Sequence, residues 1–262
     1  MTQTGVQFES RRFQAYCVGA AKAGTYSLAG MLETDFRVAH EPDRPELLDA
    51  VVAFDKGSLT TGKLDRYLLE RDRRLQLELD SSWANYFVMD RLAALFPEAR
   101  FIQLIRDCYT WLESIINHLI VRTIPEDVQS FLDWWFEPSQ YPHGKFDRRL
   151  QEAGVYSLEC FVTRWSVHAV GPARAIPPDR LITIRTPEIR SSAQCLANFL
   201  DVSVDLIDTA KSHRNIGEKV RPLLSLVDRD YLDYTVTLIC QDSMNRYFPE
   251  IHGVSDTPRA NR

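Results

Sequence analysis

The chain has 262 residues, of which 45% are hydrophobic, 11% aromatic and 26% charged, and its formal net charge is −5. This composition is typical of a globular enzyme with one large core, and it excludes disordered, fibrous and disulfide-rich proteins. An acidic chain attracts neither nucleic acid nor an anionic membrane, so any anion that it binds must be held by a local group of cations.

Apolar runs and helical patterns alternate along the chain. Five short runs predict strands, at residues 13–19, 36–40, 74–80, 99–105 and 179–185. Helical spacing predicts helices at residues 28–32, 46–54, 64–72, 86–96, 109–121 and 193–200, with a last helix of roughly twenty residues that ends near Tyr247. The alternation favours a parallel, doubly wound α/β sheet flanked by helices, in a single domain over residues 1–262.

The cysteines and the termini of the apolar runs indicate a cytoplasmic protein. The five cysteines stand far apart and form no CxxC pair, which argues for buried, reduced thiols and against a disulfide framework or a zinc site. The histidines have no metal-ligand spacing, so we expect no metal. The apolar run over 15–21 ends at Lys22, too early for an export signal, and no run approaches the roughly 20 residues of a membrane helix.

The segment between the first strand and the first helix predicts an anion cradle. It reads Gly19-Ala20-Ala21-Lys22-Ala23-Gly24-Thr25-Tyr26-Ser27. Such a strand–loop–helix turn points backbone N–H groups at one spot, and the helix dipole favours an anion there by about 0.3 to 2 kcal/mol. The loop differs from GxxxxGK[ST], since Lys22 stands inside it and Thr25 follows the second glycine. The alternative is a purely structural turn.

A second motif follows the fourth strand. Arg106 and Asp107 stand at the end of that strand, and Ser114 comes eight residues after the arginine, in IRDCYTWLES. An arginine at a strand end and a serine on the next helix can clamp a second phosphate. Alternatively, Arg106 pairs with Asp107 or a helix end. His118, one turn after Ser114, either lines the same site or is structural.

Together the two motifs resemble those of the sulfotransferases that use 3′-phosphoadenosine 5′-phosphosulfate (PAPS), including bacterial members with a P-loop-like fold. KAGTYSL is similar to the family's 5′-phosphosulfate loop, KxGTxxL, and IRDCYTWLES is similar to its 3′-phosphate motif. More loosely, DRLITIR with NFLDV resembles a strand–helix segment of the family, and HRNIGEK resembles its C-terminal cofactor-covering loop, here about 212–222. The chain departs at Ala21 and Cys108, where prolines are usual, and at Glu113, where arginine is common.

The resemblance implies a role for each matching residue. Lys22 would contact the 5′-phosphosulfate and stabilise the leaving phosphate. Further donors around that group would come from Ala23, Gly24, Thr25, Tyr26 and Ser27. Arg106 and Ser114 would hold the 3′-phosphate. The residues that would close over it from the tail loop are Arg214, Asn215 and Lys219. The product nucleotide would be adenosine 3′,5′-bisphosphate.

The implied reaction is in-line transfer of a sulfuryl group to an acceptor hydroxyl, which needs positioning and charge stabilisation but no metal. A general base is needed, and His40 and Glu41 leave the second strand where several family members place a glutamate. We favour Glu41, because adjacent residues leaving a strand point opposite ways and only one can face the donor. Asp80, at the third strand's end, is a further candidate for base or acceptor-orienting residue. Alternatively, His40 and Glu41 are a polar strand end and Asp80 is a helix N-cap.

An aromatic, helical section at about 125–170 is expected to form the acceptor pocket, although such clusters also form core. Its candidate wall residues are Trp134, Trp135, Phe136 and Tyr141. They suit a small-molecule or carbohydrate acceptor. Two other functions stay open on sequence grounds: a P-loop kinase that phosphorylates a small molecule with ATP, and a non-catalytic nucleotide-binding module.

Overall fold

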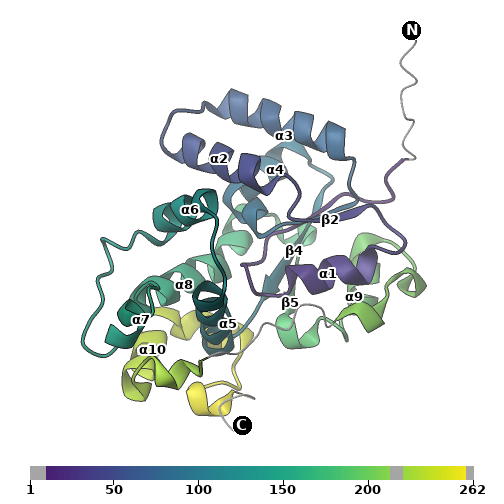
Figure 1. Cartoon of the computed structure of the whole chain (residues 1–262). Coiled ribbons are helices and arrows are strands. Elements are labelled where there is room, and N and C mark those ends of the chain that lie inside the picture. The colour runs from purple at the N-terminus through teal and green to yellow at the C-terminus, as the bar shows by residue number, and fades with distance from the viewer. Residues whose placement is uncertain (1–9, 213–220, 258–262) are drawn as a thin grey trace.

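A parallel sheet of five short strands forms the centre of the computed structural model, which describes residues 10–212 and 221–257 (Figure 1). The strands are β1 Ala15–Cys17, β2 Val38–His40, β3 Leu79–Ser81, β4 Arg100–Ile105 and β5 Leu181–Arg185. Their order is β2-β3-β1-β4-β5, and every neighbouring pair is parallel. The predicted fold class is therefore confirmed. The chain crosses from one side of β1 to the other, and in such sheets ligands bind outside the carboxyl ends of the strands at this crossing.

Helices surround the sheet in three groups (Figure 1). Their bounds are α1 Thr25–Leu32, α2 Arg44–Asp55, α3 Thr61–Leu75, α4 Met89–Leu95, α5 Cys108–Val121, α6 Glu126–Phe136, α7 Arg148–Glu152, α8 Leu158–Ala175, α9 Ala193–Leu200 and α10 Arg229–Tyr247. One group, α1 and α9, packs on Ala15 and Cys17 of β1, while α2, α3 and α4 pack on the face of Tyr16. The third group, α5, α7, α8 and α10, makes a separate helical core, and α6 bridges the second and third groups, with Phe131 in one core and Phe136 in the other. Successive residues of a strand serve opposite faces, which explains the continuous apolar character of β1 and β4.

Two predicted elements were wrong in extent. The run 74–80 was predicted as a strand, but Leu75 ends α3, Gln76 adopts a left-handed cap with φ 50°, and only Leu79–Ser81 is β3. The helical spacing of Leu64, Leu68 and Leu75 prevails over the apolar–polar alternation, typical of a strand, that begins at Leu75. The predicted helix 86–96 is a 3₁₀ helix, Trp83–Val88, followed by α4.

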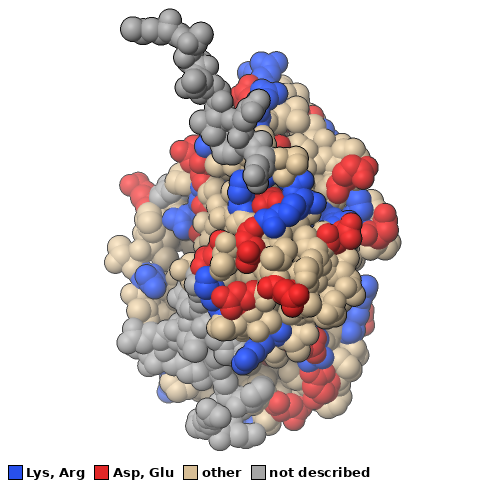
Figure 2. Space-filling model, turned by 90° about the vertical axis from the view of Figure 1, so that its right-hand side faces the viewer, with Lys and Arg blue, Asp and Glu red and all other residues tan. Residues whose placement is uncertain are grey.

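The described residues contain no helix that is long and apolar enough to cross a membrane. They also contain no group of three or more histidine, cysteine or acidic side chains placed to hold a metal ion. Four of the cysteines are buried, whereas Cys195 on α9 is exposed. On the described surface turned toward the viewer in Figure 2, acidic and basic side chains are interspersed, so this face carries no large patch of one charge.

A buried histidine in α8 gives the fold a defined acid sensitivity. His168 stacks on Tyr86, with ring centroids 3.7 Å apart. Burial, helped by the positive charge of Arg164, lowers the pKa of His168 from the usual 6.5 of histidine to about 3. Between these two values the unfolded chain binds a proton that the folded chain does not. The contribution of His168 to the free energy of unfolding is therefore fully present above pH 6.5. It falls by about 1.4 kcal/mol per pH unit between pH 6.5 and about pH 3.

This linkage predicts the behaviour of His168→Phe, which keeps a ring against Tyr86 and removes the titration. Between pH 6.5 and pH 5 the native protein is expected to lose about 2 kcal/mol more of unfolding free energy than the variant. Urea unfolding at the two pH values measures the difference. His252→Phe, at an exposed position, serves as the control. Equal losses in the native protein and His168→Phe would show that His168 does not carry the effect.

Candidate anion-binding site at the carboxyl edge of the sheet

The loop between β1 and α1 lies so close to neighbouring segments that two of its positions need glycine. A Cβ at Gly19 would stand 2.7 Å from the backbone oxygen of Leu104 in β4. A Cβ at Gly24 would stand 2.5 Å from Ile189 Cδ1, and Gly24 has φ 112°, a conformation that side chains rarely adopt. Gly24 is also the N-cap of α1. The two glycines therefore fix the loop directly over the carboxyl ends of β1 and β4.

Surrounding side chains bind the carbonyl oxygens of the loop. The three bonds are Trp111 Nε1 to Ala21 O at 2.9 Å, Arg106 Nη1 to Lys22 O at 3.4 Å, and Thr186 Oγ1 to Ala23 O at 2.6 Å. The first amides of α1 have no partner within their own helix, because helical bonds reach back four residues. With three carbonyls held by neighbours, the amide side of the loop and the positive end of α1 form a cradle suited to an anion.

Arg106 extends over this cradle from the end of β4. Its Nε donates to Thr110 Oγ1 at 2.9 Å, one turn into α5, while its Nη1 reaches Lys22 O. Asp107 caps α5 by accepting from the Thr110 amide at 2.8 Å. Trp165 of α8 donates its indole N–H to Arg106 O at 2.9 Å. Both the backbone and the side chain of the arginine are thus fixed beside the loop.

Five ionisable groups around the cradle influence one another. Burial lowers the pKa of Lys22, and the nearby charges of Arg106 and Arg122 lower it further, while Glu41 acts in the opposite direction. Burial, Lys22 and Arg122 lower the pKa of His118 to about 4. His118 is therefore neutral at neutral pH, and the charged groups here are three cations facing one carboxylate. Positive potential gathers at this edge of an otherwise acidic chain.

His40 and Glu41, at the end of β2, both turn toward the loop. His40 Nε2 lies 3.0 Å from Thr25 Oγ1 and 3.8 Å from a carboxylate oxygen of Glu41. The expectation that only one of the two can face the donor stays a prediction, but its geometric reason does not hold at Glu41. It assumed strand geometry, whereas Glu41 has φ 53°, a left-handed conformation that ends the alternation. Arg44 Nη1 holds the other Glu41 oxygen at 2.8 Å.

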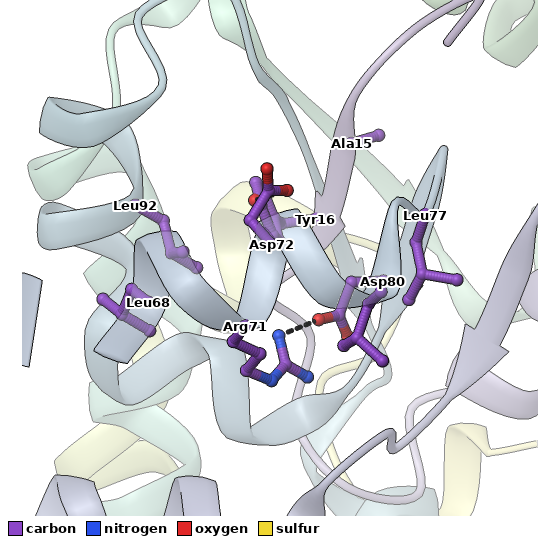
Figure 3. A pocket seen from close by; sticks show the side chains of 9 residues that line it. Ala15, Tyr16, Leu68, Arg71, Asp72, Leu77, Asp80 and Leu92 are labelled. Carbon is purple, nitrogen blue, oxygen red and sulfur yellow. Dashed lines mark hydrogen bonds and ion pairs between the residues drawn. The ribbon is translucent and has the colours of Figure 1, made fainter. Parts of the chain in front are cut away.

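Asp80 lies beneath the site instead of in it. Its side chain is 2% exposed, and its Oδ2 is 2.5 Å from Arg71 Nη1 (Figure 3). Burial raises the pKa of Asp80, and the charge of Arg71 opposes that shift. The cavity beside the pair has a volume of about 10 Å³, room for a water molecule and not for an acceptor. Asp80 therefore has no open path to an acceptor hydroxyl, and its ion pair ties β3 to α3.

Other predicted site residues are placed as follows. Ser114 is half-buried on α5, one turn before His118. Tyr26 is 42% exposed, and Ser27 is buried in the first turn of α1. Arg214, Asn215 and Lys219 lie outside the described residues, as does most of the predicted covering loop. Where the description resumes, Asn117 of α5 binds both the amide and the carbonyl of Arg221, each at 2.8 Å.

The aromatic section contributes largely to packing. Phe136 is 3% exposed and stacks on Tyr156, with ring centroids 4.4 Å apart, so it is a core residue and not a wall of an open pocket. Trp134 and Trp135 are only partly buried and pack around Phe87. Tyr141 is also partly buried.

Several residues that shape the site carry no motif. Trp111 and Thr186 bind loop carbonyls but are separated from the loop by long stretches of chain. No spacing in the sequence predicts either contact. Arg122 is recognisable only once α5 is seen to end near Lys22. His118 is the exception, because its spacing of four from Ser114 places both on one face of a helix.

Comparisons with known proteins bear on the family and the fold of this chain. A family model described as a sulfotransferase domain matches residues 14–205, more than half of the chain. A solved sulfotransferase from Alicyclobacillus acidocaldarius has 16% identity and a TM-score of 0.51, over 92% of this chain and 96% of that chain. The sulfotransferase domain of the Synechococcus PCC 7002 olefin synthase has 13% identity and a TM-score of 0.40, over 95% and 93%. At such identities the first likeness concerns the fold alone. No curated protein matches the chain.

Proposed function

The chain belongs to the sulfotransferase domain family, and from this premise we propose that it transfers a sulfuryl group from PAPS to a hydroxyl of a small-molecule or carbohydrate acceptor. The observation that carries the proposal is that Lys22 and Arg106 lie together at the loop leading into α1: Arg106 Nη1 binds the carbonyl oxygen of Lys22, and the charge of Arg106 lowers the pKa of the lysine. Two cations and a row of helix amides at one place suit a donor with several anionic groups.

The cradle fits such a donor at two points. Lys22 and the amides of residues 24–27 would bind the 5′-phosphosulfate, because the helix N-terminus and the ammonium group both favour negative charge. The amide of Ala23 donates to Ala20 O at 3.1 Å instead. Arg106 and Ser114 would hold the 3′-phosphate, which distinguishes PAPS from ATP, and an arginine can give such a group two parallel hydrogen bonds. Arg106 is already fixed by Thr110 and Trp165, so it pays little entropy on binding.

When bound, PAPS supplies the sulfuryl group and a good leaving group, the bisphosphate nucleotide. The protein's own contribution is positioning and charge stabilisation, as in phosphoryl transfer. Lys22 would stabilise the negative charge that develops on the leaving phosphate. Its partial burial strengthens that interaction, because less water screens the charge.

Glu41 is the proposed general base. Its carboxylate lies on the cradle side of the β2 end, close enough to Lys22 and His118 to shift the pKa of each. Arg44 fixes one oxygen of the Glu41 carboxylate, and the Glu41 side chain is 18% exposed. Asp80 takes no part in proton transfer, since it is buried in its pair with Arg71.

Binding of adenosine 3′,5′-bisphosphate, measured by calorimetry against ATP with magnesium, tests the donor site. The bisphosphate is expected to bind more tightly than ATP. Arg106→Ala is expected to weaken its binding by about 1.5 to 3 kcal/mol, the loss of a charged hydrogen-bonding partner. The matched control is Arg100→Ala, which removes the same charge at the opposite end of β4. Preference for ATP, or equal binding by Arg106→Ala and the native protein, would refute the assignment.

The acceptor is proposed to lie against the partly buried aromatic side chains of Trp134 and Trp135, beside Phe87 of the segment that follows β3. Such surfaces bind sugar faces and small apolar metabolites. A screen of hydroxylated metabolites and sugars with labelled PAPS would identify the class.

A further inference from the structure

The first residue of α1 is held from two strands at once. Ser81 Oγ of β3 donates to Thr25 O at 2.8 Å, and His40 Nε2 of β2 lies 3.0 Å from Thr25 Oγ1. His40 and Ser81 are direct partners in the sheet. The rings of Tyr26 and His40 meet edge to face, with centroids 5.0 Å apart, which fixes the imidazole plane. The ends of β2 and β3 therefore orient both the backbone and the hydroxyl of Thr25.

The chemistry of this contact depends on which group gives the proton. A threonine hydroxyl has one hydrogen and two lone pairs. If the imidazole donates to Thr25 Oγ1, the hydroxyl hydrogen remains available to another acceptor; if the imidazole accepts, that hydrogen is consumed. Thr25 stands in the first turn of α1, where its hydroxyl hydrogen and the first amides of the helix can converge on one anion.

We propose that His40 is a positioning residue: its Nε2–H donates to Thr25 Oγ1 and so turns the Thr25 hydroxyl hydrogen toward the phosphosulfate end of the donor. The proposal rests on the proposed function for the identity of that anion. It gives His40 a task other than proton abstraction and leaves Glu41 as the base.

The surroundings of His40 favour a neutral imidazole. The proposed hydrogen bond needs the tautomer of that neutral ring that carries its hydrogen on Nε2. Burial lowers the pKa of His40; Glu41 raises it, Arg44 lowers it, and Asp80 raises it. A neutral ring has one N–H, and a donor bond to Thr25 Oγ1 places that hydrogen on Nε2.

Two substitutions separate the ring from the hydrogen bond. His40→Phe keeps an aromatic ring beside Tyr26 and removes the N–H, whereas His40→Gln removes the ring and keeps a side-chain N–H of similar reach. His40→Phe is expected to weaken binding of adenosine 3′,5′-bisphosphate by about three- to tenfold, the effect of one lost hydrogen bond. His40→Gln is expected to recover most of that loss.

A double-mutant cycle with Thr25→Val tests whether the effect passes through the hydroxyl. Thr25→Val is expected to weaken bisphosphate binding by about tenfold or more, since it removes a hydrogen bond to a charged group. In that background, His40→Phe is expected to change binding by less than about twofold, because no hydroxyl remains to be oriented. Nitrogen NMR of the imidazole gives a second readout and is expected to show the Nε2–H form in the unliganded protein.

Each contrary outcome has its own meaning. Additive losses in the double variant, or an Nδ1–H tautomer, would overturn the positioning role while leaving the donor site intact. If His40→Gln and His40→Phe both abolish turnover without weakening bisphosphate binding, His40 is the base and the proposal is wrong. A native protein that binds no bisphosphate would refute the proposed function, and the role of His40 with it.

Discussion

Lys22→Met is expected to lower kcat by about 10²- to 10³-fold, the effect of removing one preorganised donor from a developing negative charge. The length of the side chain and its apolar part are kept, so the loop should retain its course. Rates at saturating labelled PAPS, followed as transfer to an acceptor, measure the change. Lys63→Met, which removes a lysine from the exposed start of α3, is the matched control.

The bisphosphate affinity of Lys22→Met decides how that change in kcat is interpreted. If bisphosphate affinity in Lys22→Met changes far less than kcat, the lysine acts in the transition state, since the loss of an interaction made equally in the ground state and the transition state would weaken binding and leave kcat unchanged. Unchanged kcat in Lys22→Met would contradict the assignment, and the charge on the leaving group would then have to be met elsewhere.

Glu41→Gln is expected to lower kcat by about 10²- to 10⁴-fold, the usual contribution of a positioned general base. The amide keeps the size of the side chain and can still accept from Arg44, but it does not take a proton. Bisphosphate affinity is expected to change far less than kcat, and toward tighter binding if it changes, because the substitution removes a negative charge near Lys22 and leaves the cations in place. Kinetics and calorimetry on the same preparation separate the two effects.

Glu46→Gln, in the exposed first turn of α2, is the control for that substitution. It makes the same chemical change five residues away and is expected to leave kcat unaltered. A Glu41→Gln enzyme with native turnover would remove Glu41 from proton transfer.

Local sequence signals predicted the sheet and the loop. The features that they did not predict depend on contacts between distant parts of the chain. The strand–loop–helix pattern around Lys22 and the apolar run of β4 are each contained in a few adjacent residues, and both lie where they were predicted. The extent of β3 was wrong because Leu75 fits a helix and a strand equally well until α3 is packed.

The site shows the same division. Arg106 and the loop could be found from spacing alone, because the strand end and the following helix are consecutive. The approach of the His40 ring to the Glu41 carboxylate depends on the left-handed backbone conformation of Glu41, which the sequence does not predict. Burial of Asp80 against Arg71 depends on how α3 packs on β3, a contact between elements that no local pattern specifies.

The net charge of −5 describes the whole chain and not its site. Lys22, Arg106 and Arg122 are brought to one edge of the sheet by a loop, a strand end and a helix end. Because screening weakens charges beyond roughly 8 Å at physiological salt, this local group determines what anion the protein can hold.

A donor competition tests the central claim most directly. The enzyme is given PAPS labelled on its sulfuryl group together with magnesium and ATP labelled on its terminal phosphate, and a panel of hydroxylated metabolites and sugars. We predict that the sulfuryl label moves to an acceptor hydroxyl, with one adenosine 3′,5′-bisphosphate released per transfer, and that Lys22→Met slows this step. Transfer of the phosphate label instead, or bisphosphate binding without transfer to any acceptor, would contradict the account.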